Sequence, residues 1–131
     1  MEKPNIAIIG AGMSGMICAR NLKDAGYEPI VFEKSRGVGG RMATRRTSEG
    51  LQFDHGAQYV TAKNKYFQSF IDRVASAGYA ANWEVDGKNT FVGSPSMNSM
   101  LGSVAKDISL KLNQEIKTVD KVEKLIKKNY C

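Results

Sequence analysis

Three glycines that follow the first apolar run constrain the fold of this chain more than any other feature. Gly10, Gly12 and Gly15 come directly after the run Ile6–Ile9, which has the length and composition of a buried parallel strand. Residues 16–23 then continue with helical spacing as far as Gly26, and residues 29–32 form a second apolar run. Strand, turn, helix and strand within about thirty residues predict a βαβ unit of the Rossmann type, and hence an α/β fold.

Each glycine of this loop has a distinct expected role in binding a pyrophosphate. Gly10 allows the tight exit from the strand, Gly12 lets the backbone approach the phosphates, and Gly15 lets the helix pack on the sheet. The helix N-terminus adds unpaired N–H groups, and an acid ends the second strand, where it can accept hydrogen bonds from the adenosine ribose hydroxyls. The sequence therefore predicts an adenine-dinucleotide site that includes Gly10, Gly12, Met13, Ser14, Gly15, Glu33 and Lys34.

The segment after the second strand indicates which dinucleotide is bound. Glu33 repels a ribose 2′-phosphate, which counts against NADP, although Lys34 and Arg36 soften that repulsion. A second glycine pair, Gly39-Gly40, is followed by Arg41, and a simple NAD-binding unit has no need of it. Paired glycines and a planar cationic side chain suit a longer ligand with an extended pyrophosphate and ribityl portion. The predicted cofactor is therefore FAD.

Residues 10–15, 31–46 and 53–59 together resemble the FAD-dependent amine oxidase superfamily, and most closely its renalase-like branch. The resemblance implies an oxidoreductase that transfers a hydride from a C–H next to nitrogen to the flavin, which oxygen then reoxidises with release of hydrogen peroxide. In the renalase-like branch the substrates resemble misreduced dihydronicotinamides rather than simple amines. The resemblance also implies cofactor contacts for Gly39, Gly40 and Arg41 along the pyrophosphate and ribityl chain, for Gly56, Ala57 and Gln58 near the flavin, and for Ile116 near the adenine.

No catalytic residue is identified. His55 is the only histidine, but hydride transfer to a flavin needs little proton transfer by the protein, so we expect it to position the flavin or the loop. Asp54 is expected to order the loop through hydrogen bonds to N–H groups. For Arg36, Arg45 and Arg46, the densest basic cluster, a solvated face and contact with an anionic cofactor or substrate both stay open.

Coarse patterns cover the rest of the chain. We expect residues 34–62 to be mostly loop, residues 64–77 to form a helix, and residues 82–92 to form a hairpin with a type I′ turn at Asp86-Gly87. Ser94-Pro95 is expected to start another helix as N-cap and first residue, and residues 108–112 to form a strand. The lysine-rich residues 121–128 fit either a strand or a frayed terminus.

The expected domain organisation is an FAD-binding βαβ unit over residues 1–62, the start of an interleaved α+β substrate domain over 63–106, and return strands over 107–131. Family members are more than twice as long and carry a late glycine-acid segment, whereas no glycine follows Gly102. The expected fold is thus incomplete, a fragment that binds FAD weakly or not at all and does not turn over without a complementing C-terminal chain. The alternatives are a non-catalytic NAD or ADP binding module, a split-protein subunit, and a remnant without ligand.

Composition excludes several other classes. The net charge is +6, but acidic residues are spread along the chain and aromatics make up only 8%, so we expect a small-molecule substrate and no nucleic acid. The two cysteines, Cys18 and Cys131, have no metal-ligand spacing, so no metal is expected. The glycines interrupt the first apolar run and no stretch approaches a membrane span, which favours a cytoplasmic protein.

Overall fold

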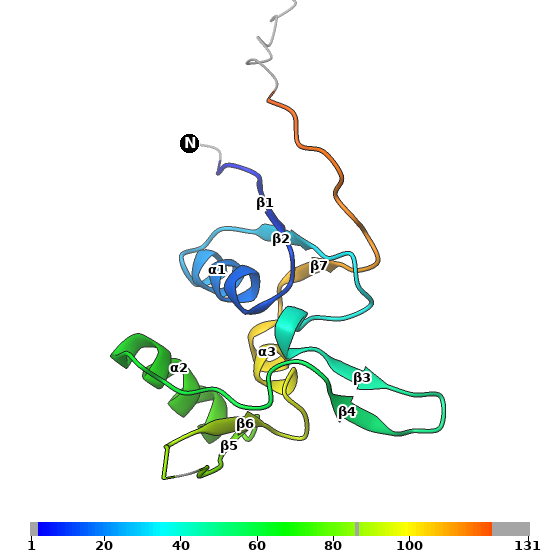
Figure 1. Cartoon of the computed structure of the whole chain (residues 1–131). Coiled ribbons are helices and arrows are strands. Elements are labelled where there is room, and N and C mark those ends of the chain that lie inside the picture. Colours follow the sequence, from blue (N-terminus) through cyan, green and yellow to red (C-terminus); the bar gives the residue numbers. More distant parts are fainter. Residues whose placement is uncertain (1–2, 86, 122–131) are drawn as a thin grey trace, which may run out of the picture.

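The computed structural model describes residues 3–85 and 87–121 and contains a parallel three-stranded sheet. Its strands are β1 (Ile6–Ile9), β2 (Pro29–Phe32) and β7 (Ser109–Lys111), in the order β1-β2-β7. Helix α1 (Met13–Asp24) connects β1 to β2 and packs against the sheet (Figure 1). The predicted α/β class and its Rossmann-type βαβ unit are confirmed.

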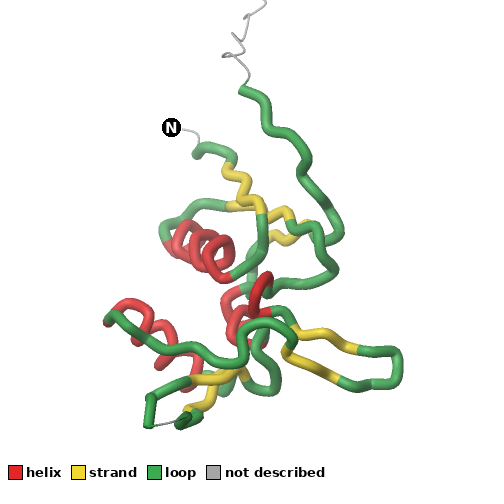
Figure 2. Tube along the Cα trace, viewed as in Figure 1, coloured by secondary structure: helices red, strands yellow, loops and turns green. Residues whose placement is uncertain are grey.

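The remaining elements lie below this sheet in the view of Figure 1 and are joined by long loops, which Figure 2 shows. A short helical turn η1 (Gly40–Met42) leads into an antiparallel hairpin of β3 (Thr44–Arg46) and β4 (Gln52–Asp54). Helix α2 (Lys65–Ser76) is followed by a second antiparallel hairpin, β5 (Ala80–Asn82) with β6 (Phe91–Gly93). Helix α3 (Ser99–Val104) then returns the chain to β7.

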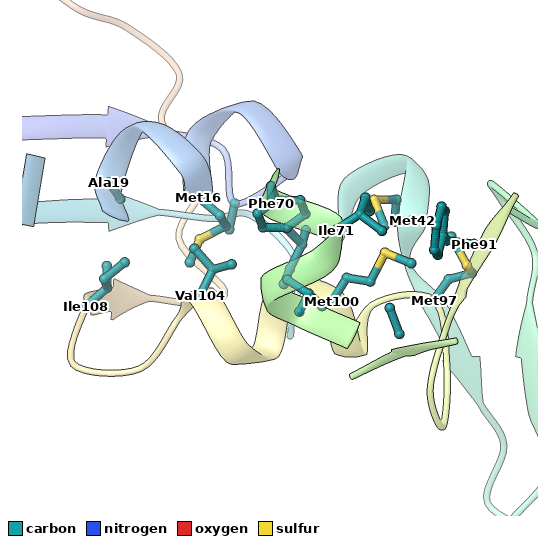
Figure 3. Packing of buried hydrophobic residues seen from close by; sticks show 14 of the residues in the cluster. Met16, Ala19, Met42, Phe70, Ile71, Phe91, Met97, Met100, Val104 and Ile108 are labelled. Carbon is teal, nitrogen blue, oxygen red and sulfur yellow. The ribbon is translucent and has the colours of Figure 1, made fainter. Parts of the chain in front are cut away.

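One hydrophobic cluster joins the two groups of elements. Met16 of α1, Ile71 of α2 and Met100 of α3 are all fully buried, and Figure 3 shows their side chains gathered in one row between the helices. Val104 packs close to Met16 at the sheet end of this row, and Phe91 closes the other end. Because burying apolar surface is the main stabilising contribution, α3 acts as the internal link between sheet and hairpins.

Residues 34–62 are mostly loop, as expected, but the segment 44–54 within them forms the β3–β4 hairpin, which was not predicted. Thr44 pairs with Asp54 and Arg46 with Gln52, and all residues of the two strands are exposed or half-buried. A hairpin with water on both faces shows no alternation of apolar and polar residues, so the usual strand signal is missing. The turn is closed by Gly50, whose φ is +82°.

The predicted N-cap of the third helix was also wrong. Helix α3 begins at Ser99, with Asn98 as N-cap, and Ser94-Pro95 lies in a tight turn before it. In this turn the backbone of Gly93 approaches Ser96 so closely that a Cβ on Gly93 would lie 2.1 Å from the Ser96 carbonyl oxygen. The side chains of the predicted apolar face are nevertheless buried as expected: Met97, Met100, Leu101 and Val104.

The other predicted elements are found with small shifts. Asn64 caps α2 by accepting a 2.9 Å hydrogen bond from the N–H of Phe67. The second hairpin begins two residues earlier than expected, at Ala80, and Val85 bridges Lys88 across its turn. The turn residue Asp86, the segment 122–131 with most of the ambiguous lysine-rich stretch, and Cys131 lie outside the described residues.

Candidate functional site

Three glycine-containing segments meet around one cavity of about 1010 Å³, which we call the glycine cavity. The N–H of Gly39 donates a 3.0 Å hydrogen bond to the carbonyl of Ala11, which joins the second glycine pair to the glycine loop. The N–H of Ala57 donates a 2.7 Å bond to the carbonyl of Arg41, which adds the third segment. The lining residues are Ile9, Gly10, Gly12, Met13, Ser14, Gly15, Gly39, Gly40, Arg41, Met42, His55, Gly56 and Ala57.

Backbone contacts explain why side chains are excluded at three of these positions. A Cβ on Gly15 would lie 2.0 Å from the carbonyl oxygen of Gly10, so α1 can pack on the exit of β1 only without one. A Cβ on Gly56 would lie 2.1 Å from the carbonyl oxygen of Arg41. Gly40 has a φ of +55° and faces the Cα of Gly12. These glycines are therefore required because backbone segments of this chain pack closely against one another, whether or not a ligand is bound.

The charge around the glycine cavity is positive. Helix α1 starts at its edge with Gly12 as N-cap, and no acidic residue lies in the first turn. The first N–H groups of a helix have no acceptor within the helix and carry a partial positive charge, so Met13, Ser14 and Gly15 present donors to an anion. Arg41 adds the only permanent charge among the residues that line the cavity. This combination suits a pyrophosphate.

Glu33 ties the glycine loop to the end of β2. One carboxylate oxygen accepts a 2.7 Å hydrogen bond from the N–H of Ala11, and the other accepts a 2.8 Å bond from the N–H of Ser35. Burial alone would raise the pKa of Glu33, but these backbone hydrogen bonds outweigh it and, with a smaller contribution from Lys34, hold the pKa below its ordinary value. Glu33 is therefore ionised, and its carboxylate stabilises the glycine loop and the loop after β2 through these two hydrogen bonds. Each oxygen keeps a further lone pair, so ribose binding stays a prediction.

Residues 8–74, about half of the chain, match the family model described as the NAD(P)-binding Rossmann-like domain. The chain belongs to this family. The matched part of this Rossmann-like domain includes the whole lining of the glycine cavity and Glu33. Dinucleotide binding is the family's stated property, and the geometry above supplies the loop, the helix terminus and the acid that such binding uses.

Curated relatives of this Rossmann-like domain include an oxidase and desaturases. The L-glutamate oxidase precursor of Streptomyces diastatochromogenes is 44% identical over 62 residues, which cover 46% of this chain and 9% of that protein. The 4,4'-diapophytoene desaturase of Staphylococcus aureus is 38% identical over 65 residues, which cover 50% of this chain and 13% of that protein. The chain thus matches only a small part of the length of these relatives.

A solved structure shows the same relationship. A triple mutant of putrescine oxidase, made to redesign cofactor binding, superimposes with a TM-score of 0.50 at 32% identity. The superposition covers 61% of this chain and 17% of the oxidase chain. The Rossmann-like domain described here therefore has the fold of part of an oxidase.

Besides Glu33, three residues of the predicted site do not line the glycine cavity of this Rossmann-like domain. Lys34 and Gln58 are exposed outside it. Ile116 is 37% exposed and lies two residues beyond Gln114, whose N–H donates to the carbonyl of Glu33, so it follows a segment that is bonded to the carboxyl end of β2, and it does not line the cavity. The roles expected for these three residues are not tested by the fold and stay predictions.

The structure adds lining residues that the sequence pattern missed. Ile9, the last residue of β1, is 58% exposed at the cavity edge, and Met42 also lines it. Position next to a glycine of the motif was the available signal for Ile9. His55, which was expected to position the flavin or the loop, lines the cavity as well. Asp54 orders its surroundings as expected, but over a longer range: it accepts a 2.6 Å bond from the Thr44 hydroxyl and a 3.2 Å bond from the N–H of Met97.

No helix in the described ranges is long and apolar enough to cross a membrane. Within the same ranges, no three metal-binding side chains gather closely enough to hold an ion.

Proposed function

We propose that the glycine cavity binds FAD and that this chain provides the FAD-binding region of a flavin-dependent oxidoreductase of the amine oxidase type. The observation that carries the proposal is the meeting of the glycine loop, the Gly39–Arg41 turn and residues 55–57 around one cavity. The glycine loop and the Gly39–Arg41 turn alone would be enough to bind a pyrophosphate. Residues 55–57 extend the lining beyond the expected pyrophosphate position, which suits a ligand with a further ring system. The oxidases among the relatives support the same assignment.

The cavity fits FAD in size and in the chemistry of its lining. About 1010 Å³ is at the upper end of the range for small-molecule sites. The N–H groups of Met13, Ser14 and Gly15, with Arg41, would hold the pyrophosphate, and Glu33 the adenosine ribose. The backbone of Gly56 and Ala57 would approach the flavin. FAD, when bound, supplies the acceptor for a hydride, so the residues here need only bind, orient and exclude water.

The renalase-like branch is the finer part of the proposal. Support comes from the sequence runs 33–46 and 54–59, which include both the Gly39–Arg41 turn and the segment beside it. A substrate with an oxidisable C–H next to nitrogen, either a dihydronicotinamide or an amine, follows from this assignment. Residues 63–106 would then begin the substrate domain, residues 107–131 would return toward the cofactor domain, and the protein would act in the cytoplasm.

We also propose that a further polypeptide segment or complementing chain pairs with the sheet. Strand β1 has β2 as its one partner within the described residues, so its other edge offers unpaired N–H and C=O groups. Ile9 and Ile30 of the sheet are exposed, by 58% and 37%. Covering these apolar side chains would stabilise the sheet and the cofactor site that it carries.

Ligand titration tests the cofactor. FAD, NAD and ADP are each added to the purified chain, and binding is followed by flavin fluorescence and by thermal unfolding. We expect weak FAD binding with weaker NAD and ADP binding, and no peroxide formation from a dihydronicotinamide by the chain alone. NAD or ADP binding that is clearly tighter than FAD binding would contradict the proposal.

A second candidate is a non-catalytic NAD or ADP binding module. It is favoured by the family description, which names NAD(P), and by Glu33, which suits any unphosphorylated adenosine ribose. The same titration separates the two functions, because this module needs no flavin and would bind ADP as well as FAD.

A further inference from the structure

A second cavity of about 890 Å³ lies on the other side of the Gly39–Arg41 turn, and we call it the basic cavity. It shares only Gly40 and His55 with the glycine cavity. Its walls come from the loop after β2, from β3 and the turn that follows, and from Asn98. The lining residues are Ser35, Arg36, Gly37, Val38, Gly40, Ala43, Thr44, Arg45, Arg46, Thr47, Ser48, His55 and Asn98.

Three arginines converge on this cavity from two segments. Arg36 comes from the loop after β2, and Arg45 and Arg46 come from β3. The guanidinium of Arg36 lies 3.5 Å from the carbonyl oxygen of Arg46, and Nε of Arg46 donates a 3.2 Å bond to Gln52. The first contact holds the loop after β2 against β3, and the second lies within the β3–β4 hairpin, so all three arginines line one cavity.

These charges have no acidic counterpart in the part of the chain that the structure describes. None of the three arginines forms an ion pair within 4.0 Å there, and no carboxylate lines the basic cavity. Two acids lie in the hairpin: Asp54 already accepts bonds from Thr44 and the N–H of Met97, and Glu49, in the turn, is exposed and does not line the cavity. Grouped like charges repel one another, so the arrangement is stabilised when an anion enters.

The donors match a phosphate group. Guanidinium forks bind phosphate oxygens in pairs, and the hydroxyls of Ser35, Thr47 and Ser48 add neutral donors around them. We propose that the basic cavity binds the phosphate or diphosphate group of a small phosphorylated ligand, separately from the dinucleotide of the glycine cavity. This site goes beyond the proposed function and does not depend on FAD binding.

Inorganic pyrophosphate is the probe, and its binding to the full chain is followed in two-dimensional proton–nitrogen NMR spectra. We expect saturable shifts at residues 35–37 and 44–48 and in the arginine side chains. Replacement of all three arginines by glutamine (Arg36→Gln, Arg45→Gln, Arg46→Gln) should weaken this binding roughly tenfold or more, because hydrogen bonds to charged groups are removed.

Two controls make the result decisive. Lys88→Gln, Lys117→Gln and Lys121→Gln remove the same charge at exposed positions elsewhere and should leave the binding unchanged. The arginine variant should also keep its FAD affinity and a folded circular dichroism spectrum. Shifts confined to residues 10–15, equal losses in both triple variants, or a parallel loss of FAD binding in the arginine variant would overturn the proposal. Unchanged FAD binding in a glycine-loop variant, with the pyrophosphate shifts intact, would overturn only the cofactor assignment.

Discussion

The carboxylate of Glu33 accepts a 2.7 Å hydrogen bond from the backbone N–H of Ala11, so the residue that follows β2 is bonded directly to the glycine loop. The second carboxylate oxygen accepts a hydrogen bond from the N–H of Ser35, in the loop that leads to the Gly39–Arg41 turn. Glu33 is only 8% exposed. One side chain thus joins the glycine loop to the start of the loop that leads to the Gly39–Arg41 turn.

Replacement of Glu33 by glutamine should destabilise the fold. Glutamine has one acceptor oxygen, so one of the two backbone N–H groups would face an NH₂ donor and lose its partner. We expect the free energy of unfolding to fall by ~1–3 kcal/mol, measured by urea denaturation. Glu49→Gln, at an exposed position in the hairpin turn, is the matched control and should change stability by less than about 0.5 kcal/mol. Equal effects of the two changes would contradict this role for Glu33.

The pH dependence of stability should carry the signature of Glu33. Its pKa is lower in the folded chain than the ordinary value of 4.5, so its stabilising contribution is complete above that value and is lost as the pH falls through the folded-state pKa. The difference in unfolding free energy between the wild type and Glu33→Gln should therefore be constant near neutral pH and shrink in acid. Urea denaturation over this range measures it, and a difference that grows in acid would reverse the assigned sign.

Two helical glycines should respond in opposite directions to alanine. A Cβ at Gly15 would lie 2.0 Å from the Gly10 carbonyl oxygen, so Gly15→Ala should cost ~1–3 kcal/mol and weaken dinucleotide binding. Gly102 of α3 has nothing within 4 Å of the added Cβ and no unusual φ, so Gly102→Ala should gain ~0.5–1 kcal/mol. Thermal and urea unfolding measure both. Stabilisation by Gly15→Ala would contradict the packing described.

Gly56→Ala tests the third segment of the glycine cavity. The new Cβ would lie 2.1 Å from the Arg41 carbonyl oxygen, so residues 56–57 would have to move away and the bond from the Ala57 N–H would weaken. We expect weaker FAD binding with less effect on ADP, because ADP would not reach this segment. Gly37→Ala, where no atom lies within 4 Å and φ is ordinary, should leave both affinities unchanged.

Ile71→Ala tests whether α2 shares its core with the Rossmann-like unit. Ile71 is fully buried in the cluster that includes Met16 and Met100, so truncation should cost ~2–5 kcal/mol in a single unfolding transition. Val119 is 77% exposed, and Val119→Ala should have little effect. Two separate transitions, with only one of them shifted by Ile71→Ala, would show that the two groups of elements unfold independently.

Local patterns were enough to predict β1, α1 and β2, because their apolar runs, helical spacing and glycines act over a few neighbouring residues. Helix α2 was predicted for the same reason, from Phe67, Phe70, Ile71 and Val74 on one face. The β3–β4 hairpin was missed because both of its faces are exposed to water, so its strands lack the alternation of apolar and polar residues that predicts a strand. Its pairing depends on hydrogen bonds between residues 44–46 and 52–54. The start of α3 was misplaced because the turn at Gly93 depends on its contact with Ser96.

By itself, the sequence determined that a βαβ unit with a pyrophosphate-type glycine loop and an acid after the second strand would form, since each of these depends on local spacing. The tertiary structure alone decided which segments meet: Gly56 against Arg41, Glu33 against Ala11, and three arginines around one basic cavity. Such contacts join residues from different segments of the chain, so they depend on how these segments pack in three dimensions and not on the spacing within any one of them.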